Sequence, residues 1–157
     1  MLRALTLIIL SLVTSGVHAE TAKPFNLETQ NGRIDLQSLK GKVVYVDFWA
    51  SWCAPCRKSF PWMNKMQTKY KDNDLVIIGI NLDSKRKHAD NFLEKNPVLF
   101  TVAFDPSGTT ADAYNVQVMP TSYLIDRQGE IIMEHKGFLS RQQDKLEKSL
   151  QDALKNP

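Results

Sequence analysis

The segment 43–50 is the feature that most constrains the fold of this chain, because β-branched and aromatic residues occupy both its odd and its even positions. A strand with apolar side chains on both faces must be covered on both sides, as in sheets that lie under layers of helices. The segment therefore predicts a buried central strand of an α/β fold. Asp47 is the exception within it.

Strand-like and helix-like segments alternate along the rest of the chain. Residues 25–39 predict a hairpin that turns at Asn31-Gly32, and apolar residues at helical spacing predict a helix over 58–71. The later elements are expected as strands over 75–82, 98–104, 121–126 and 130–138, and as helices over 84–95 after a Ser84 cap, over 109–114, and after a Ser140 cap near the C-terminus. This order predicts a single α/β domain.

The first residues predict a signal peptide rather than part of the fold. Arg3 precedes an apolar stretch over 4–13, and Val17-His18-Ala19 places small residues where cleavage requires them. Cleavage after Ala19 would leave a domain over 20–157 in the periplasm or another extracytoplasmic compartment. The apolar stretch is shorter than the roughly 20 residues that span a membrane, and an uncleaved anchor is the alternative.

Charge indicates no nucleic-acid partner. The formal net charge is +3, and basic residues are interspersed with acidic ones. The one basic run, Lys85 to His88, is interpreted as the solvated start of a helix. Nucleic-acid binding would need a basic face with aromatic platforms, which the sequence does not offer.

The only two cysteines, Cys53 and Cys56, lie between the predicted central strand and the predicted helix that follows. A disulfide that closes so short a loop removes little entropy from the unfolded chain, so redox chemistry explains the pair better than stapling does. At a helix N-terminus, free N–H groups and the helix dipole favour the thiolate of the first cysteine. Ala54 and Pro55 add no charge, which predicts moderate thiolate stabilisation and a fairly reducing couple.

A structural zinc site is the main alternative for the cysteine pair. Zinc needs four ligands, and after the predicted signal peptide the only histidines are His88 and His135. Neither has a ligand-like partner nearby in the sequence, so we interpret both as surface or strand-face residues and expect no metal and no other cofactor than the redox-active cysteine pair.

Residues 46–56, with the Trp52-Cys53-Ala54-Pro55-Cys56 core, closely resemble the active-site strand and turn of thioredoxins. Later positions agree in the same order: Pro61 with the kink proline of the active-site helix, Met119-Pro120-Thr121 with the cis-proline loop, and Gly129 and Gly137 with glycines around the last strand. The export signal, the hairpin and an insertion between Asn81 and Asp105 resemble the TlpA/ResA branch of extracytoplasmic disulfide reductases. The resemblance implies a three-layer thioredoxin-like fold with a central mixed sheet flanked by helices.

The resemblance also implies roles for individual residues. Cys53 would attack a protein disulfide, Cys56 would resolve the mixed disulfide, and Asp47 would assist proton transfer at Cys56. An Asp47 that serves only the structure is the alternative. Pro120 would be cis, which leaves the Met119 backbone free to pair with an extended substrate segment.

The resemblance also implies which residues near the cysteines contact the client protein. Trp52, Ala54 and Pro55 would contact the client, whereas Trp49 is expected in the core. The implied partners are a disulfide-containing client protein and a membrane-bound thiol protein that donates electrons, and the chain is expected to act as a monomer.

Two positions depart from the family pattern. Ser59 stands where some cytochrome-maturation members carry a glutamate, so service to apocytochrome c is one candidate role among several. Gly79 stands where thioredoxins place a lysine near the buried aspartate, and the loss of that cation should raise the pKa of Asp47.

Two competing functions follow from the same fold. A peroxidase of the related peroxiredoxin branch would need a Pro-x-x-x-Thr-x-x-Cys motif, which Cys53 lacks. A non-catalytic chaperone that holds copper or a client protein remains the alternative, although similar copper chaperones usually have a wider cysteine spacing and a dedicated histidine.

Overall fold

The computed structural model describes residues 20–156, so the signal peptide expected over 1–19 lies outside the described residues. The strands are β1 (Glu20–Thr21), β2 (Asn26–Thr29), β3 (Gly32–Asp35), β4 (Val43–Trp49), β5 (Leu75–Asn81), β6 (Thr101–Phe104), β7 (Thr121–Ile125) and β8 (Glu130–Lys136). The α-helices are α1 (Ala54–Tyr70), α2 (Arg86–Lys95), α3 (Thr109–Ala113) and α4 (Gln143–Lys155), and the short 3-10 helices are η1 (Leu36–Leu39), η2 (Lys71–Asn73) and η3 (Ser140–Gln142).

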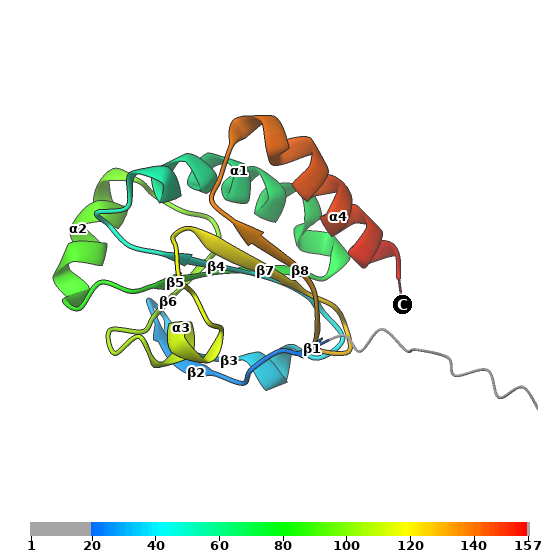
Figure 1. The fold of residues 1–157 in the computed structure, drawn as a ribbon, viewed down its shortest axis with the longest axis horizontal. Helices are drawn as coiled ribbons and strands as arrows, with labels where there is room; N and C mark the ends of the chain where they lie inside the picture. Colours follow the sequence, from blue (N-terminus) through cyan, green and yellow to red (C-terminus); the bar gives the residue numbers. More distant parts are fainter. Residues whose placement is uncertain (1–19, 157) are drawn as a thin grey trace, which may run out of the picture.

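The strands form one mixed sheet with β4 near its centre. The strand order is β1-β8-β7-β4-β5-β6-β2-β3, in which β4 runs parallel to β5 and antiparallel to β7. Helices α1, α2 and α4 lie on one face of the sheet, and α3 lies on the other (Figure 1). The β2–β3 hairpin forms the edge of the sheet next to β6. The expected three-layer fold and the N-terminal hairpin are thus confirmed. Between residues 20 and 156, none of the helices has the length and apolar character needed to cross a bilayer.

The side chains of β4 alternate between the two faces of the sheet, and each face carries its own hydrophobic cluster. Tyr45 and Trp49 pack toward α1 and α4, whereas Val46 and Phe48 pack toward α3 on the opposite face. Successive side chains of a strand alternate between faces, so Asp47 shares the face of Tyr45 and Trp49. This places the only carboxylate of β4 under the helix that carries the cysteines.

The helix after the cysteines begins earlier than expected, at Ala54 rather than at residue 58, so Cys56 lies inside it. Pro55 is compatible with the first turn because that turn leaves its N–H groups unpaired in any case, and Cys53 serves as the N-cap. Pro61 lies inside the same helix.

Both serine caps expected from the sequence are wrong. Helix α2 begins at Arg86 after an N-cap at Lys85 that makes no side-chain capping bond, and an Arg86–Asp90 ion pair of 2.8 Å supports its first turn instead. Ser140 begins the 3-10 turn η3, which leads directly into α4 without a side-chain cap. At α2 an ion pair, rather than a capping side chain, accompanies the start of the helix.

Two further differences concern strands. The strand expected over 98–104 starts only at Thr101, because Asn64 of α1 binds the preceding segment: its amide donates to the Pro97 carbonyl and its Oδ1 accepts from Leu99 N–H. The sequence analysis also missed β1, which pairs with the start of β8 through Glu20 and Thr21. Both depend on contacts between residues far apart in the chain.

Candidate active site

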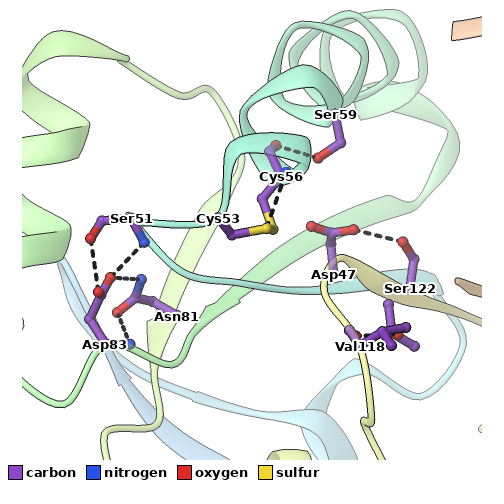
Figure 2. Close-up of a disulfide and its surroundings, with 10 residues drawn as sticks. Asp47, Ser51, Cys53, Cys56, Ser59, Asn81, Asp83, Val118 and Ser122 are labelled. Atoms are coloured by element: carbon purple, nitrogen blue, oxygen red, sulfur yellow. Dashed lines mark hydrogen bonds between the residues drawn. A yellow bond between two sulfur atoms is a disulfide. The ribbon is translucent and has the colours of Figure 1, made fainter. Parts of the chain in front are cut away.

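The two cysteines occupy the start of α1, directly after the carboxyl end of the central strand β4. They form a disulfide, and the Cys53 Sγ accepts a hydrogen bond of 3.3 Å from the Cys56 backbone N–H (Figure 2). The sulfur of Cys53 is therefore the N-cap acceptor of the helix. A thiolate at this atom would keep that bond and would also lie at the positive end of the helix dipole, which lowers a thiol pKa.

The two sulfurs differ in access. Cys53 lines an open groove of about 410 Å³, whereas Cys56 is only 1% exposed and does not line it. A client sulfur can thus approach Cys53 from the groove, and the buried Cys56 is placed to react with Cys53 Sγ, to which it is bonded in the disulfide.

Asp47 lies behind the cysteines and is completely enclosed by protein. Its Oδ1 accepts a hydrogen bond of 2.6 Å from Ser122 Oγ, and its Oδ2 has no hydrogen-bond partner among residues 20–156. Figure 2 shows the carboxylate on the side of the sheet that faces the disulfide. Burial raises the pKa of Asp47 to about 7, although the bond from Ser122 works against this rise. The carboxyl group can therefore gain or lose a proton near neutral pH.

Gly79 explains why no cation offsets the burial of Asp47. The two residues are direct partners in the β4–β5 register. A Cβ at Gly79 would lie 2.9 Å from Phe100 Cε2 and 3.2 Å from Trp49 Nε1, so aromatic rings occupy the space that a longer side chain would need. The rise in the pKa of Asp47 expected from the missing lysine agrees with the direction found here.

The residue that precedes Trp52 is tied to the end of β5 by a buried carboxylate. Asp83 accepts hydrogen bonds from the Ser51 N–H at 2.9 Å, from the Ser51 hydroxyl at 2.8 Å and from the Asn81 amide at 2.7 Å (Figure 2). Asn81 Oδ1 in turn accepts from the Asp83 N–H. This network holds the turn that carries Trp52 and Cys53 against the neighbouring strand.

Of the residues expected to contact a client, Trp52, Ala54, Pro55 and Met119 line one groove, and Pro120 does not. The groove is lined by Trp52, Cys53, Ala54, Pro55, Leu82, Val116, Gln117, Val118 and Met119. None of these side chains is charged, and Trp52 is 69% and Val118 50% exposed. Trp49, in contrast, is fully buried against Phe60 and Phe92, as expected for a core residue.

The Met119–Pro120 peptide bond is cis, as expected. The loop is held at both ends: Thr121 Oγ1 donates to the Val118 carbonyl at 2.7 Å, and the Pro120 carbonyl accepts from the Gly137 N–H at 2.7 Å. Met119 lines the groove opposite the turn of Trp52, whereas Pro120 is buried. Ser59, the other departure from the family pattern, is buried and donates to the Cys56 carbonyl at 2.8 Å.

The sequence analysis missed several residues of the site: Ser122, Asp83, Ser51, Leu82, Val116, Gln117 and Val118. The last three directly precede the Met119-Pro120 loop, and Asp83 follows the carboxyl end of a buried strand, so position relative to the motifs was an available signal. Ser122 gave none, because its pairing with Asp47 joins distant strands. Within residues 20–156, no group of three or more His, Cys, Asp or Glu side chains is arranged to hold a metal ion.

Comparison with known proteins agrees with this geometry. The profile of the Redoxin family matches residues 17–153. The chain belongs to the Redoxin family. Within it, the thiol-disulfide oxidoreductase ResA of Bacillus subtilis (strain 168) is 38% identical over 120 residues, which cover 76% of this chain and 67% of that protein. The chain is thus a thioredoxin-like thiol-disulfide oxidoreductase of the ResA type, and its substrates are proteins that contain disulfides.

Solved structures support the same assignment for this ResA-type chain. A crystal structure from Chlorobium tepidum, whose proposed identity is thiol:disulfide interchange protein DsbE, superposes with a TM-score of 0.85 at 48% identity and covers 87% of this chain and 96% of that one. The exposed lipoprotein thioredoxin Etrx1 of Streptococcus pneumoniae superposes with a TM-score of 0.74 at 28% identity, covering 83% and 99%.

Proposed function

We propose that this ResA-type protein works outside the cytoplasm as a reductase of protein disulfides. The observation that carries the proposal is the position of Cys53 Sγ, which caps α1 at the edge of an uncharged groove while Asp47 lies buried behind the pair. The predicted signal peptide supports the location, as does the similarity to an exposed lipoprotein thioredoxin. The uncharged Ala54-Pro55 dipeptide supports the reducing direction.

The reaction proceeds in two exchange steps. The Cys53 thiolate attacks one sulfur of the client disulfide, forms a mixed disulfide and releases the other client sulfur as a thiolate. Asp47 then takes the proton from the Cys56 thiol, and the Cys56 thiolate attacks Cys53 Sγ. The Cys53–Cys56 disulfide forms, and the second client sulfur leaves. Two electrons have passed from the protein to the client, and a membrane-bound dithiol protein would restore the reduced pair.

The groove defines the part of the client that binds. An extended, uncharged segment beside the client cysteine fits between Trp52 on one side and Val118 and Met119 on the other, and the Met119 backbone is the candidate pairing partner for it. Apocytochrome c, with its paired cysteines, is one candidate client, so cytochrome c maturation is one candidate role of the protein.

Insulin reduction with dithiothreitol as electron source tests the activity. The wild-type protein should accelerate the reaction, and Cys53→Ser should abolish the acceleration because no attacking sulfur remains. Cys56→Ala should retain the attack and accumulate mixed disulfides, which can be identified by mass spectrometry to name the client. Full activity in Cys53→Ser would contradict the mechanism.

Two measurements test the direction and the competing chaperone function. Equilibration of the Cys53–Cys56 pair with a dithiothreitol or glutathione buffer gives its potential, and a value near that of a strong oxidant would reverse the proposed direction. Stoichiometric copper in the purified protein would instead favour a metal-binding chaperone.

A further inference from the structure

Three polar side chains form a straight row across three neighbouring strands, starting at Asp47. Asp47 of β4 is the direct register partner of Ser122 of β7, and Ser122 is the direct partner of His135 of β8. Direct cross-strand partners point to the same face, with their Cβ atoms about 5 Å apart. The row therefore runs across the face that α1 and α4 cover, from beneath the cysteines toward the edge of the sheet (Figure 1).

The first two residues of this row, Asp47 and Ser122, are joined by a hydrogen bond. Ser122 is buried, and its hydroxyl donates to Asp47 Oδ1 at 2.6 Å. A serine hydroxyl has one donor and two acceptor positions, so Ser122 can accept a second proton while it donates the first. No other side chain among residues 20–156 donates to the Asp47 carboxylate.

The outer half ends at a histidine that faces both the interior and solvent. The Nε2 atom of His135 is buried and has no hydrogen-bond partner among the described residues, although the side chain as a whole is only half-buried. Its neighbours Glu134 and Lys136 point to the other face and pair with each other at 3.1 Å. A buried polar atom without a partner usually has a functional or solvent-linked explanation.

We propose that Asp47, Ser122 and His135 form a proton path between the buried Cys56 and solvent, with His135 at its outer end. The proposal rests on the function proposed above, in which Asp47 takes a proton from Cys56. Since Asp47 is enclosed, an Asp47 carboxyl group that is protonated needs a way to release its proton before it can take the one from Cys56. His135 does not touch the sulfurs, so it is a positioning residue that acts through Asp47.

Before the transfer, the Asp47 carboxylic acid, the Ser122 hydroxyl and the His135 ring are all neutral, and one proton moves outward through them. His135 Nε2 has no hydrogen bond to Ser122 at rest, so its ring must first turn to bring Nε2 to the Ser122 hydroxyl. The Asp47 carboxylic acid then gives its proton to Ser122 Oγ, Ser122 gives its own proton to His135 Nε2, and the imidazolium releases the proton on Nδ1 to water. The direction reverses when client disulfide formation is catalysed. Burial, followed by the charge of Lys145 on α4, lowers the pKa of His135, which keeps the ring neutral and able to accept near pH 7.

Other titratable groups around the row do not replace His135. Tyr45 of β4 faces Asp47, but burial and the charge of Asp47 raise the pKa of its hydroxyl, so it stays neutral. Cys56 of α1 is the proton donor itself, and Lys145 is the charged group of α4 that acts on His135. His135 is the titratable side chain in direct register with Ser122.

Stopped-flow tryptophan fluorescence can test the path, because Trp49 and Trp52 lie beside the cysteines. Reduced protein mixed with a disulfide peptide should show a concentration-dependent attack by Cys53 and a concentration-independent resolution by Cys56. In weak buffer at pH 7, His135→Gln should slow the resolution about tenfold or more and leave the attack unchanged. Added imidazole, a diffusible proton carrier, should restore the rate. Ser122→Ala should slow the same phase.

The control is His88→Gln, since His88 is the other histidine among residues 20–156 and is exposed on α2. It should resolve at the wild-type rate. An unchanged resolution rate in His135→Gln would overturn the path, and so would a slowed rate that imidazole leaves unrestored, because that result indicates a packing defect. A wild-type protein without exchange activity would overturn the proposed function instead, so the two failures are distinguishable.

Discussion

Asp47 shows how one residue can conflict with its surroundings and serve the chemistry for that reason. Every other residue of β4 is apolar or aromatic, and the carboxylate has a single hydrogen bond, from Ser122. A buried carboxylate is destabilised in its charged form, so its pKa rises. The position of Gly79 and the rings of Trp49 and Phe100 exclude a cation that would restore the usual value. Near pH 7 the residue therefore exchanges protons at low energetic cost.

Replacing Asp47 by Asn should change how stability depends on pH. Burial raises the pKa of Asp47 from 3.8 to about 7, so between these values the folded protein holds a proton that the unfolded chain has released. The contribution of Asp47 to the free energy of unfolding therefore falls as pH rises from 4 to 7, by about 4 kcal/mol. Asp47→Asn lacks this loss. Urea unfolding of the oxidised proteins at pH 4 and pH 8 measures the difference.

Asp72→Asn is the matched control for that measurement. Asp72 is exposed in η2, so its variant should follow the wild-type pH dependence. Equal pH dependence of Asp47→Asn and the wild type would show that the carboxyl group ionises in the folded protein as it does in water.

At the scale of elements, the reactive turn is held by the strand beside it rather than by its own residues. The turn between β4 and α1 contains Ser51 and Trp52, and the exposed Trp52 contributes little packing. Asp83, just after β5, binds Ser51 through both its N–H and its hydroxyl. The parallel pairing of β4 with β5 brings the two carboxyl ends together and makes this bond possible.

Asp83→Ala should therefore destabilise the protein and loosen the turn. The change leaves the Ser51 N–H and the Asn81 amide without their acceptor, and unpaired buried donors cost about 1–3 kcal/mol each. We expect a loss of roughly 2–3 kcal/mol in chemical denaturation, together with faster amide hydrogen exchange at Ser51. The exposed Asp72→Ala should change stability by less than about 0.5 kcal/mol. Unchanged exchange at Ser51 would contradict the positioning role.

At the scale of the whole molecule, stability comes from two apolar clusters that lie on opposite faces of one sheet. The helix-side cluster contains Trp49, Met63 and Leu150, and the other contains Phe48 and Ile80. The disulfide lies at the border of the first cluster, and its partners are only three positions apart in sequence. We therefore expect the fold to persist in both oxidation states of the pair, as a protein that cycles between them requires.

Reduction should lower the free energy of unfolding by no more than about 2 kcal/mol, because so short a loop constrains the unfolded chain little. Stabilisation of the Cys53 thiolate by the start of α1 works against even this loss. Guanidinium unfolding with and without dithiothreitol measures the difference, and the double variant Cys53→Ser, Cys56→Ser should be insensitive to the reductant. A reduced protein that unfolds without denaturant would show that the disulfide is structural.

Much of the molecule follows from local sequence. Apolar runs that alternate with segments of helical spacing were sufficient to predict the α/β class and the order of the elements after β1. Buried strands and amphipathic helices leave such periodic patterns in a sequence. The short cysteine spacing and its place after a buried strand were sufficient for the redox chemistry. The start of α1 at Ala54 was misjudged because the Cys53 sulfur caps that helix. The start of α2 at Arg86 was misjudged because Ser84 does not cap it, and an Arg86–Asp90 ion pair lies in its first turn instead.

Tertiary structure alone decided which residues surround those sulfurs. Cross-strand register brings Ser122 and His135 into line with Asp47, and the parallel β4–β5 pair brings Asp83 to Ser51. Sequence periodicity reports which face of its own element a residue occupies, but the register between strands is set by packing and hydrogen bonds over the whole sheet. The reactive pair and Asp47 were therefore visible in the chain itself, whereas Ser122 and His135 became visible beside Asp47 only once the sheet was assembled.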